Sequence, residues 1–551
     1  MKIVIVGGVA GGMSAATRLR RLNEDAEIIV LDKGPYVSFA NCGLPYYISG
    51  DIQDRSKLIV QTPEKLEERF ELDVRPNSEV TEIDRQNKEV LVQIDSESYR
   101  LSYDKLILSP GARPLMPPIQ GLEEAGNIFT LRTVPDVDQI KAYIEEAQPK
   151  KAVVIGAGFI GLEMVESLAH QGLEVALVEQ APHILPTLDE EMAAFISEEL
   201  QDKGVQVYTG KAAQIFEDQG QTVVLDDGHR LDSDLTFLSI GVRPESQLAE
   251  DAGLEIGLRQ GIKVNENYQT NDPDIFAVGD AIIVNQTITN QEALISLASP
   301  ANRQGRQVAD VISGVKRKNK GSIGTAIVRV FNRVAASTGL IEKQAEEAGL
   351  TYRVIHASGQ SHASYYPGSE YLLLKLIFNP ESGEIYGAQG IGGDGVDKRI
   401  DVLATAIKGG IPADELMELE LTYAPPFGSA KDPVNMLGYI AANIMEGITD
   451  TVQWYQVENL QDEGYQLLDV RSEGEIKRDG SLPHSTEIPL DNLRDRLDEL
   501  DLEKAYITSC QSGLRSYLAE RILRQSGVKE VKNLDGAFKL YSTVYPDKII
   551  K

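Results

Sequence analysis

Two cysteines, Cys42 and Cys510, are the residues whose chemistry the sequence raises first. They are the only cysteines among 551 residues, Cys42 in "SFANCGLPYY" and Cys510 in "SCQSGLRS". That spacing gives neither a CxxC pair nor a metal site, and we expect no bound metal. A rare thiol is either a small buried hydrophobe or a reactive group, and a reactive cysteine acts as the thiolate. The elements that position each sulfur therefore decide its use.

Cys42 comes just before a predicted short helix, "GLPYYISG". A helix N-terminus stabilises a thiolate through its dipole and free N–H groups, so we expect a lowered pKa for Cys42. A CxxxxC pair would store two electrons as an internal disulfide, but no second cysteine lies nearby. Cys42 therefore has to form its disulfide with a sulfur from another molecule.

Cys510 lies between a predicted strand, "AYITS", and a predicted helix, "SYLAERILRQ". A loop from Cys510 to Arg515 can direct successive backbone N–H groups at the sulfur. Such a nest stabilises a thiolate and then a persulfide anion. The positively charged Arg515 would lie over this loop.

The clearest binding motif is "GAGFIG", which follows a strand pattern and opens a helix pattern. Gly156 makes the turn, Gly158 lets the backbone approach a pyrophosphate, and Gly161 lets helix and strand pack closely. The next strand ends at Glu179, whose carboxylate would accept hydrogen bonds from ribose hydroxyls and repel a 2′-phosphate. Because "QAPH" follows without an arginine, the motif favours NADH over NADPH.

The N-terminal motif, "GGVAGG", departs from that pattern. It has Gly7 and Gly12 but places Val9 where the middle glycine belongs, and its strand-helix-strand unit ends at Asp32. One interpretation is a nucleotide-type turn without a ligand. The alternative is supported by "TNDPDIFAVGDA", an apolar strand that delivers Asp280 and matches the element that binds the FAD ribityl chain in flavoproteins. The segments "YDKLILSPGARP" and "SDLTFLSIGVRP" are similar in sequence, which supports two dinucleotide-binding units with the same fold.

Composition narrows the class of protein. The formal net charge is −30 and no apolar run reaches the ~18–20 residues of a membrane helix. We therefore expect no nucleic-acid partner, no membrane partner and a cytoplasmic location, since the N-terminus enters a strand directly. The low cysteine content excludes a disulfide-stapled secreted fold.

The pattern of elements predicts an α/β chain with two Rossmann-like dinucleotide-binding domains, a third α+β domain and a fourth, C-terminal α/β unit. The family resemblance that these motifs carry implies that the third is an α+β dimerisation domain and the fourth a C-terminal α/β rhodanese domain. The expected FAD-binding domain is discontinuous and encloses the NADH-binding domain. The predicted boundaries are 1–115 and 246–322 for FAD, 116–245 for NADH, 323–447 for dimerisation and 448–551 for rhodanese.

The combination of these motifs resembles the flavoprotein disulfide reductases with two dinucleotide sites. Within them it is similar to the single-cysteine branch of coenzyme A disulfide reductases, NADH oxidases and NADH peroxidases. The last hundred residues resemble a rhodanese domain, with "LLDVRSEGEIKRDGSLPHS" upstream and "NLDGAF" downstream of the cysteine loop. Together they resemble coenzyme A disulfide reductase–rhodanese fusions, also described as NADH-dependent persulfide reductases.

This resemblance implies a homodimer that binds FAD, NADH and coenzyme A and acts on a small-molecule disulfide, persulfide or polysulfide. It implies the following FAD- and NADH-binding residues: Gly7, Gly12, Asp32, Lys33, Val80, Ser109, Gly111, Arg132, Asp280, Gly156, Gly158, Gly161, Glu179 and Gly241. It implies the following coenzyme A-binding residues: Ser14, Arg18, Arg21, Ser38, Asn41, Asn302 and the partner-side Lys431. The implied catalytic residues are Cys42, Cys510, Tyr365, Tyr423 and Arg515.

Individual residues favour one branch of the family. The peroxidase and oxidase members carry a histidine in the first glycine-rich turn, where this chain has Ala10, so peroxide or oxygen reduction is disfavoured. "SFANCGLPYY", "SYYPGS" and "LTYAPPF" instead match the coenzyme A disulfide reductases, and Tyr365 and Tyr423 are the tyrosines implied beside the partner subunit's thiol. Without the family resemblance, the alternative interpretation of either tyrosine is a half-buried core residue.

The first helix carries three arginines, Arg18, Arg20 and Arg21, which we expect to open onto the cysteine loop and bind phosphate. A solvated helix face is the alternative. Phe70 stands where some members have a coenzyme A-binding lysine. The alternatives for the whole chain are an NADH oxidase, or a persulfide carrier or redox sensor with slow turnover. For the last domain they are an inactive rhodanese fold and a phosphatase.

Overall fold

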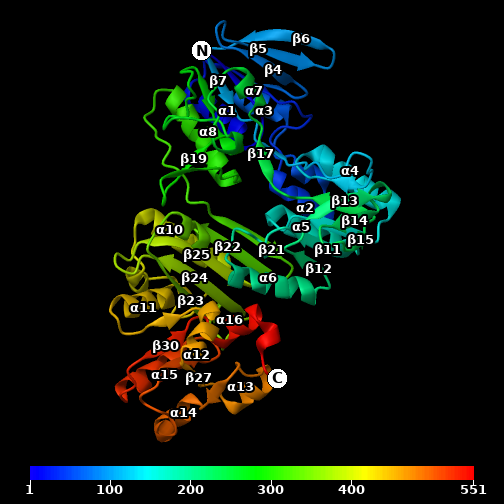
Figure 1. The fold of residues 1–551 in the computed structure, drawn as a ribbon. Coiled ribbons are helices and arrows are strands. Elements are labelled where there is room, and N and C mark those ends of the chain that lie inside the picture. The colour runs from blue at the N-terminus through cyan, green and yellow to red at the C-terminus, as the bar shows by residue number, and fades with distance from the viewer. The chain divides into compact units, whose positions relative to one another are not determined.

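A computed structural model describes residues 1–551. The chain divides into two compact units (Figure 1). The first unit contains residues 1–182 and 204–324, and the second contains residues 183–203 and 325–551. Helix α6 (Glu190–Asp202) thus belongs with the second unit, although it lies within the stretch predicted to be the NADH-binding domain.

The first parallel sheet of unit 1 has the strand order β18-β7-β1-β2-β3. Helix α1 (Ala10–Leu22) connects the central strand β1 to its neighbour β2 and packs against α8 (Ala298–Ile312). A Cβ on Gly305 would lie 2.1 Å from the Gly11 carbonyl oxygen, so glycine allows this close approach. The strands are β1 (Lys2–Val6), β2 (Glu27–Leu31), β3 (Asp73–Arg75), β7 (Lys105–Leu108) and β18 (Ile275–Ala277).

The second parallel sheet of unit 1 has the order β12-β11-β10-β16-β9, with α5 (Phe159–His170) between β10 and β11. Its strands are β9 (Ile128–Phe129), β10 (Lys151–Ile155), β11 (Glu174–Glu179), β12 (Gln206–Thr209) and β16 (Leu235–Leu238). The two echoing segments of the sequence end in β8 (Ala112–Pro114) and β17 (Val242–Pro244), and these strands pair with each other antiparallel.

Smaller elements complete unit 1. Three small antiparallel sheets have the orders β4-β5-β6, β13-β14-β15 and β19-β20. Their strands are β4 (Glu79–Asp84), β5 (Glu89–Ile94), β6 (Glu97–Ser102), β13 (Ala213–Glu217), β14 (Thr222–Leu225), β15 (Arg230–Asp232), β19 (Val284–Gln286) and β20 (Gln291–Ala293). The remaining helices are α2 (Leu44–Ser49), α3 (Pro63–Phe70), α4 (Val134–Ala147) and α7 (Gln247–Asp251).

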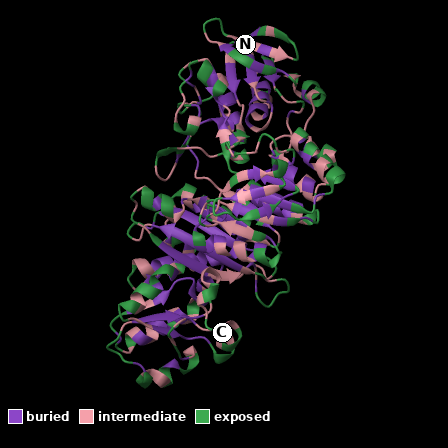
Figure 2. Cartoon of the chain, turned by 45° about the vertical axis from the view of Figure 1, so that its right-hand side comes forward, coloured by how far each residue is buried: buried purple, intermediate pink, exposed green.

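Unit 2 contains an antiparallel sheet of order β21-β22-β25-β24-β23. Alternate residues Leu372, Leu374 and Leu376 of β24 join one apolar cluster with α10 (Val396–Gly409) and α11 (Pro433–Met445). The strands, largely purple in Figure 2, are β21 (Ala326–Val330), β22 (Arg333–Gly339), β23 (Arg353–Gln360), β24 (Tyr371–Phe378) and β25 (Ile385–Gly392), and α9 (Glu342–Glu347) follows β22.

The C-terminal part of unit 2 is a parallel sheet of order β26-β30-β29-β27-β28. Its strands are β26 (Thr451–Val452), β27 (Gln466–Asp469), β28 (Ser485–Glu487), β29 (Tyr506–Ser509) and β30 (Val531–Leu534). Its helices are α12 (Val457–Asp462), α13 (Glu473–Asp479), α14 (Leu490–Leu493), α15 (Leu514–Gln525) and α16 (Ala537–Val544).

A buried group of charges joins three parts of unit 2. We call it the junction cluster; it consists of Asp189, Glu191, Glu342, His356, Lys375 and Asp535. The Lys375 ammonium contacts Glu191 and Glu342 and lies 2.7 Å from Asp189, so it fills the place where three carboxylates converge. The His356 ring lies 2.7 Å from Asp535 of the C-terminal part and 3.3 Å from Glu191 of the α6 helix. The C-terminal part is therefore tied to this sheet by paired charges shielded from water.

None of the helices combines the length and the apolar character that crossing a membrane requires.

Candidate active site

The turn between β10 and α5 has the geometry of a dinucleotide site. Gly156 has φ +101°, and a Cβ on Gly161 would lie 1.9 Å from the Gly156 carbonyl oxygen, so both positions need glycine. A Cβ on Gly158 would meet nothing within 4 Å, so this glycine leaves space beside the uncapped start of α5. Glu179 accepts hydrogen bonds from Ala157 and Ala181 N–H, each at 2.7 Å. These residues fit a pyrophosphate and its ribose.

The turn between β1 and α1 follows the same plan. Gly7 has φ +99°, and a Cβ on Gly12 would lie 1.9 Å from the Gly7 carbonyl oxygen. Val9 is the N-cap of α1, with no side-chain hydrogen bond to the helix start. Asp32 accepts hydrogen bonds from Gly8 and Gly34 N–H, each at 2.8 Å, and burial raises the pKa of its carboxyl group. The free helix start and the fixed carboxylate fit a second dinucleotide.

Arg132 connects several of the residues implied to bind the first dinucleotide. Its guanidinium donates to the Pro110 carbonyl oxygen at 2.8 Å and to Glu245 at 2.7 Å, and Lys33 donates to the same carboxylate at 2.7 Å. Burial would raise the pKa of Glu245, but these two cations hold it below its ordinary value. Asn41 donates to the Arg132 carbonyl oxygen at 3.1 Å, which attaches the Cys42 loop to this group.

Other predicted residues take supporting positions in unit 1. Ser109 donates its backbone N–H to the Val6 carbonyl oxygen at 2.8 Å, and Gly111 and Gly241 have φ of +75° and +113°. Val80 is buried in β4, so its side chain belongs to the core. Burial raises the pKa of Asp280, and Arg132 opposes this effect.

Cys42 is a free, exposed cysteine in the turn Asn41–Gly43, directly before α2. Partial burial of the sulfur, and then the carboxylates of Glu163 and Asp280, raise the pKa of its thiol. The expectation of a lowered Cys42 pKa was therefore wrong, because the protein groups around the thiol raise it. The helix that follows has six residues, too few for a strong dipole, and the nearby charges are negative.

Cys510 is a free, buried cysteine at the end of β29, 1% exposed. Gly513, with φ +107°, donates its N–H to Cys510 Sγ at 3.1 Å, and Phe538 donates its N–H to the Cys510 carbonyl oxygen at 2.9 Å. The first turn of α16 is thus hydrogen-bonded to the start of the Cys510 loop. Arg515 forms a two-point ion pair with Glu475, at 2.8 and 2.6 Å.

The two tyrosines that the resemblance implied lie next to each other in unit 2. The hydroxyls of Tyr365 and Tyr423 are 3.1 Å apart, and the side chains are 74% and 48% exposed. This hydrogen bond raises the pKa of Tyr365. Two exposed aromatic rings whose hydroxyls are hydrogen-bonded to each other are typical of a surface that binds another molecule.

Comparison with known proteins identifies the family. Residues 1–305 match the pyridine nucleotide-disulphide oxidoreductases, residues 325–433 match their dimerisation domain, and residues 453–543 match the rhodanese-like domain.

The chain belongs to the pyridine nucleotide-disulphide oxidoreductase family.

Two solved structures resemble this oxidoreductase over nearly its whole length. Reduced Bacillus anthracis CoADR-RHD is 51% identical, with a TM-score of 0.98 over 100% of this chain and 99% of that one. A NAD-dependent persulfide reductase from A. fulgidus is 38% identical, with a TM-score of 0.93 over 98% of this chain and 100% of that one.

Two relatives match about four fifths of this chain. A coenzyme A disulfide reductase of Staphylococcus haemolyticus is 36% identical, over 80% of this chain and 100% of its own length. An NADH oxidase of Methanocaldococcus jannaschii is 35% identical, over 79% of this chain and 97% of its own length.

The arginines of α1 in this oxidoreductase do not all face the cysteine loop, contrary to expectation. Arg20 is buried, 6% exposed, and donates to the carbonyl oxygens of Phe70, Glu24 and Glu71, so it is a core residue. Arg18 pairs with the buried Asp310 at 2.8 Å, whereas Arg21 is exposed.

The remaining residues predicted to bind coenzyme A are spread over both units. Ser14 on α1 donates to Asn302 on α8 at 2.6 Å, so these two are brought together. Ser38 has φ +46° and donates its N–H to the Gly8 carbonyl oxygen at 2.8 Å, which places it beside the first glycine turn. Lys431 is exposed in unit 2, directly before the N-cap residue Asp432 of α11.

Three acidic residues of the oxidoreductase escaped the sequence analysis. Glu163 on α5 accepts a hydrogen bond from the Tyr46 hydroxyl at 3.0 Å, Glu245 binds Arg132 and Lys33, and Glu475 binds Arg515. The signal was available for Glu163, because it interrupts the apolar helix "FIGLEMVESLAH" and a half-buried acid needs a partner.

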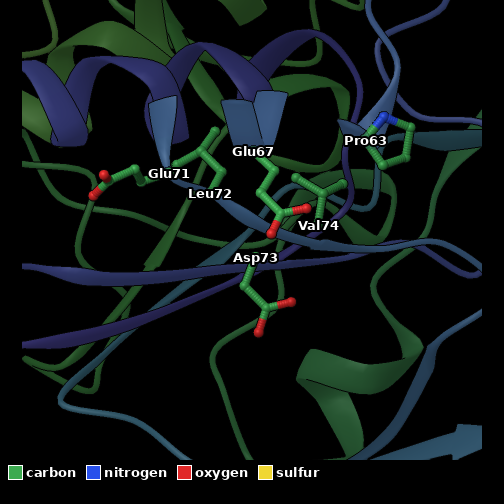
Figure 3. A pocket seen from close by; sticks show the side chains of 6 residues that line it. All are labelled: Pro63, Glu67, Glu71, Leu72, Asp73 and Val74. Atoms are coloured by element: carbon green, nitrogen blue, oxygen red, sulfur yellow. The ribbon is translucent and has the colours of Figure 1, made fainter. Parts of the chain in front are cut away.

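A pocket of about 310 Å³ lies between α3 and β3 (Figure 3). Its lining consists of Pro63, Glu67, Glu71, Leu72, Asp73 and Val74. Three carboxylates would repel a phosphate, so this pocket does not suit either dinucleotide.

Proposed function

We propose that this chain forms a homodimer that oxidises NADH to reduce coenzyme A disulfide, coenzyme A persulfide or polysulfide through Cys42. Members of this family use FAD and NADH, and bound FAD would pass the two electrons of the NADH hydride to sulfur. The observation that carries the proposal is the free, exposed Cys42 without a second cysteine near it, in a chain whose other cysteine lies in a rhodanese-type loop.

The residues divide the work between binding and sulfur chemistry. Gly156, Gly158 and Glu179 would hold NADH, while Gly7, Asp32 and Asp280 would hold FAD. The Cys42 thiolate would attack one sulfur of the substrate, forming a mixed disulfide and releasing a thiolate that takes up a proton from water, in the manner of thiol–disulfide exchange. Two electrons and a proton then release coenzyme A thiol and restore Cys42. With coenzyme A persulfide, the products are coenzyme A thiol and hydrosulfide.

The partner subunit and the last domain supply further parts of the proposal. A dimerisation domain at residues 325–433 supports the homodimer, and the joined Tyr365 and Tyr423 hydroxyls would stabilise the leaving thiolate at the partner's Cys42. Ser14, Asn302, Arg21, Ser38, Asn41 and Lys431 would contact coenzyme A. Cys510 would carry sulfane sulfur as a persulfide that the Gly513 N–H supports.

Steady-state NADH oxidation tests the proposal. We expect rapid turnover with coenzyme A persulfide or disulfide and little with oxygen, and we expect Cys42→Ser to abolish it. Under non-reducing conditions the intact mass should carry a coenzyme A adduct that the same variant loses. Oxygen consumption that matches NADH loss would instead support an NADH oxidase, a function favoured by the Methanocaldococcus relative and disfavoured by Ala10. Stoichiometric reduction without turnover would support a redox sensor.

A further inference from the structure

A buried carboxylate on α8 holds two arginines from different parts of unit 1. Asp310 is 1% exposed, and its two oxygens accept hydrogen bonds from the Nε atoms of Arg18 on α1, at 2.8 Å, and Arg317, at 2.9 Å. Arg317 lies in the segment that follows α8. Burial would raise the pKa of Asp310, but the hydrogen bonds from both arginines lower it, so the carboxylate stays charged. We call Arg18 and Arg317 the arginine pair.

The arginine pair is suited to binding an anion. Two guanidiniums face one carboxylate, which leaves one positive charge uncompensated in a chain of net charge −30. The Arg317 side chain is 49% exposed and donates to Asp310 through Nε, so its terminal amino groups can donate elsewhere. Such a fork of N–H groups matches the oxygens of a phosphate. The alternative is a structural ion pair that only fastens the segment after α8 to α1.

Helix α1 leads from the Cys42 loop to the arginine pair. The start of the helix lies beside that loop, because Ser38 donates its N–H to the Gly8 carbonyl oxygen at 2.8 Å. Ser14 follows within α1 and donates to a side chain of α8 at 2.6 Å. Arg18 comes one turn after Ser14, about 6 Å farther along the helix axis. Polar residues of α1 therefore continue from the cysteine loop toward the arginine pair.

We propose that Arg18 and Arg317, held on the same carboxylate of Asp310, bind the 3′-phosphate of coenzyme A. This inference rests on the proposed function, in which the coenzyme A sulfur pairs with Cys42. The phosphates of coenzyme A lie at the other end of its extended arm from the sulfur, so they are placed away from the thiol. A phosphate monoester carries about two negative charges at neutral pH. Phe70 supplies no cation where some family members have a lysine, and Arg317 supplies one.

Calorimetric titration of the FAD-loaded Cys42→Ser protein tests this inference, with coenzyme A thiol and 3′-dephospho-coenzyme A as the two probes. Serine prevents disulfide formation, so the Kd reports non-covalent binding alone. We expect this parent protein to bind coenzyme A about ten-fold or more tightly than the dephospho form. Adding Arg317→Gln should weaken coenzyme A binding about ten-fold and change dephospho-coenzyme A binding less than about two-fold. Arg317→Lys keeps the charge but loses the fork, and it should weaken coenzyme A binding about three-fold.

Lys318→Gln is the matched control. It removes the next cation along the chain, whose ion pair with Glu266 has side chains that are 67% and 54% exposed. It should change the Kd of either probe less than about two-fold.

Turnover of the protein with Cys42 intact provides a second measurement. Arg317→Gln should raise the KM for coenzyme A disulfide about ten-fold and leave kcat unchanged, because the phosphate contact is the same in the ground state and the transition state. The KM for the dephospho-coenzyme A disulfide should not change.

Three results would overturn the inference, even in a protein that reduces coenzyme A disulfide rapidly. They are a parent protein that does not distinguish the two probes, an Arg317→Gln variant that weakens both probes equally, and one that weakens neither. If the wild type reduced no coenzyme A disulfide, the proposed function would fail. The titrations would still decide whether the arginine pair binds the 3′-phosphate.

Discussion

The junction cluster predicts that the stability of unit 2 depends on pH between about 6.5 and 9. The perturbation that tests this is Asp535→Asn. Asp535 accepts hydrogen bonds from the His356 backbone N–H at 3.0 Å and from Gln453 at 3.0 Å, besides its contact with the His356 ring. Asparagine has nearly the same shape but removes the charge that balances His356.

The magnitude follows from the pKa of His356. Burial alone would lower it, but the carboxylates of Asp535 and Glu191 raise it from 6.5 to about 9. At about 1.4 kcal/mol per pH unit, this difference corresponds to about 3 kcal/mol. Because the folded pKa lies above the unfolded one, the contribution is complete below pH 6.5 and is lost as the pH rises through 9.

Trp454 provides the assay. It is the only tryptophan, 7% exposed, and it follows Gln453, which binds Asp535. Its fluorescence should therefore report urea unfolding at the junction. We expect the wild-type free energy of unfolding to fall by about 3 kcal/mol between pH 6.5 and 9. At pH 6.5 the free energy of unfolding of Asp535→Asn should be about 3 kcal/mol lower than that of the wild type. Most of its decrease between pH 6.5 and 9 should be absent.

The control is Lys529→Gln, which breaks an ion pair whose side chains are 78% and 77% exposed. It should shift stability by no more than about 0.5 kcal/mol and keep the wild-type slope. The difference between the curves isolates His356 from other groups that titrate in this range. Parallel curves for Asp535→Asn and the wild type would refute the reasoning.

Four further predictions concern two glycines of the turns, the glutamate at the end of β11 and the loop around Cys510. Gly12→Ala should destabilise the fold by more than about 3 kcal/mol in urea unfolding, because its Cβ would lie 1.9 Å from a carbonyl oxygen. Gly158→Ala, whose Cβ meets no protein atom within 4 Å, should unfold like the wild type but raise the KM for NADH about ten-fold or more; equal destabilisation of both variants would contradict this account. Glu179→Ala should shift the ratio of kcat/KM for NADH over NADPH downward by about 10- to 100-fold, and an unchanged ratio would show that its carboxylate does not select the cofactor. Glu475→Gln should speed modification of Cys510 by a small thiosulfonate about two- to five-fold, because Arg515 then faces the sulfur without its counter-ion; slower modification would show that the ion pair instead opens the loop.

The sequence was sufficient where one local rule decides the structure. The strand-turn-helix patterns at Gly156 and Gly7, the antiparallel strands after residue 320 and the strand-loop-helix around Cys510 were confirmed, because glycine geometry and apolar periodicity act over a few residues. The pairing of β8 with β17 agrees with the echo between their segments.

The sequence was insufficient where distant charges decide. Arg18, Arg20 and Arg21 are indistinguishable by type, yet each residue step turns a helix by about 100°, and only the neighbours of α1 make Arg20 a core residue. The pKa of Cys42 depends on Glu163 and Asp280, which are more than a hundred residues away along the chain. The separate grouping of residues 183–203 also follows from contacts of α6 that no local pattern encodes.

The junction cluster has a consequence for modularity. A rhodanese domain is often considered a cassette that can be cut out or exchanged at a linker. Here the C-terminal part contributes Asp535 and Gln453 to an interior that it shares with β23, so a cut near residue 447 would leave His356 without its main counter-charge. A transplanted domain would have to bring an acid and an amide at the same two places. The last hundred residues are thus a separate fold that cannot be exchanged as an independent part.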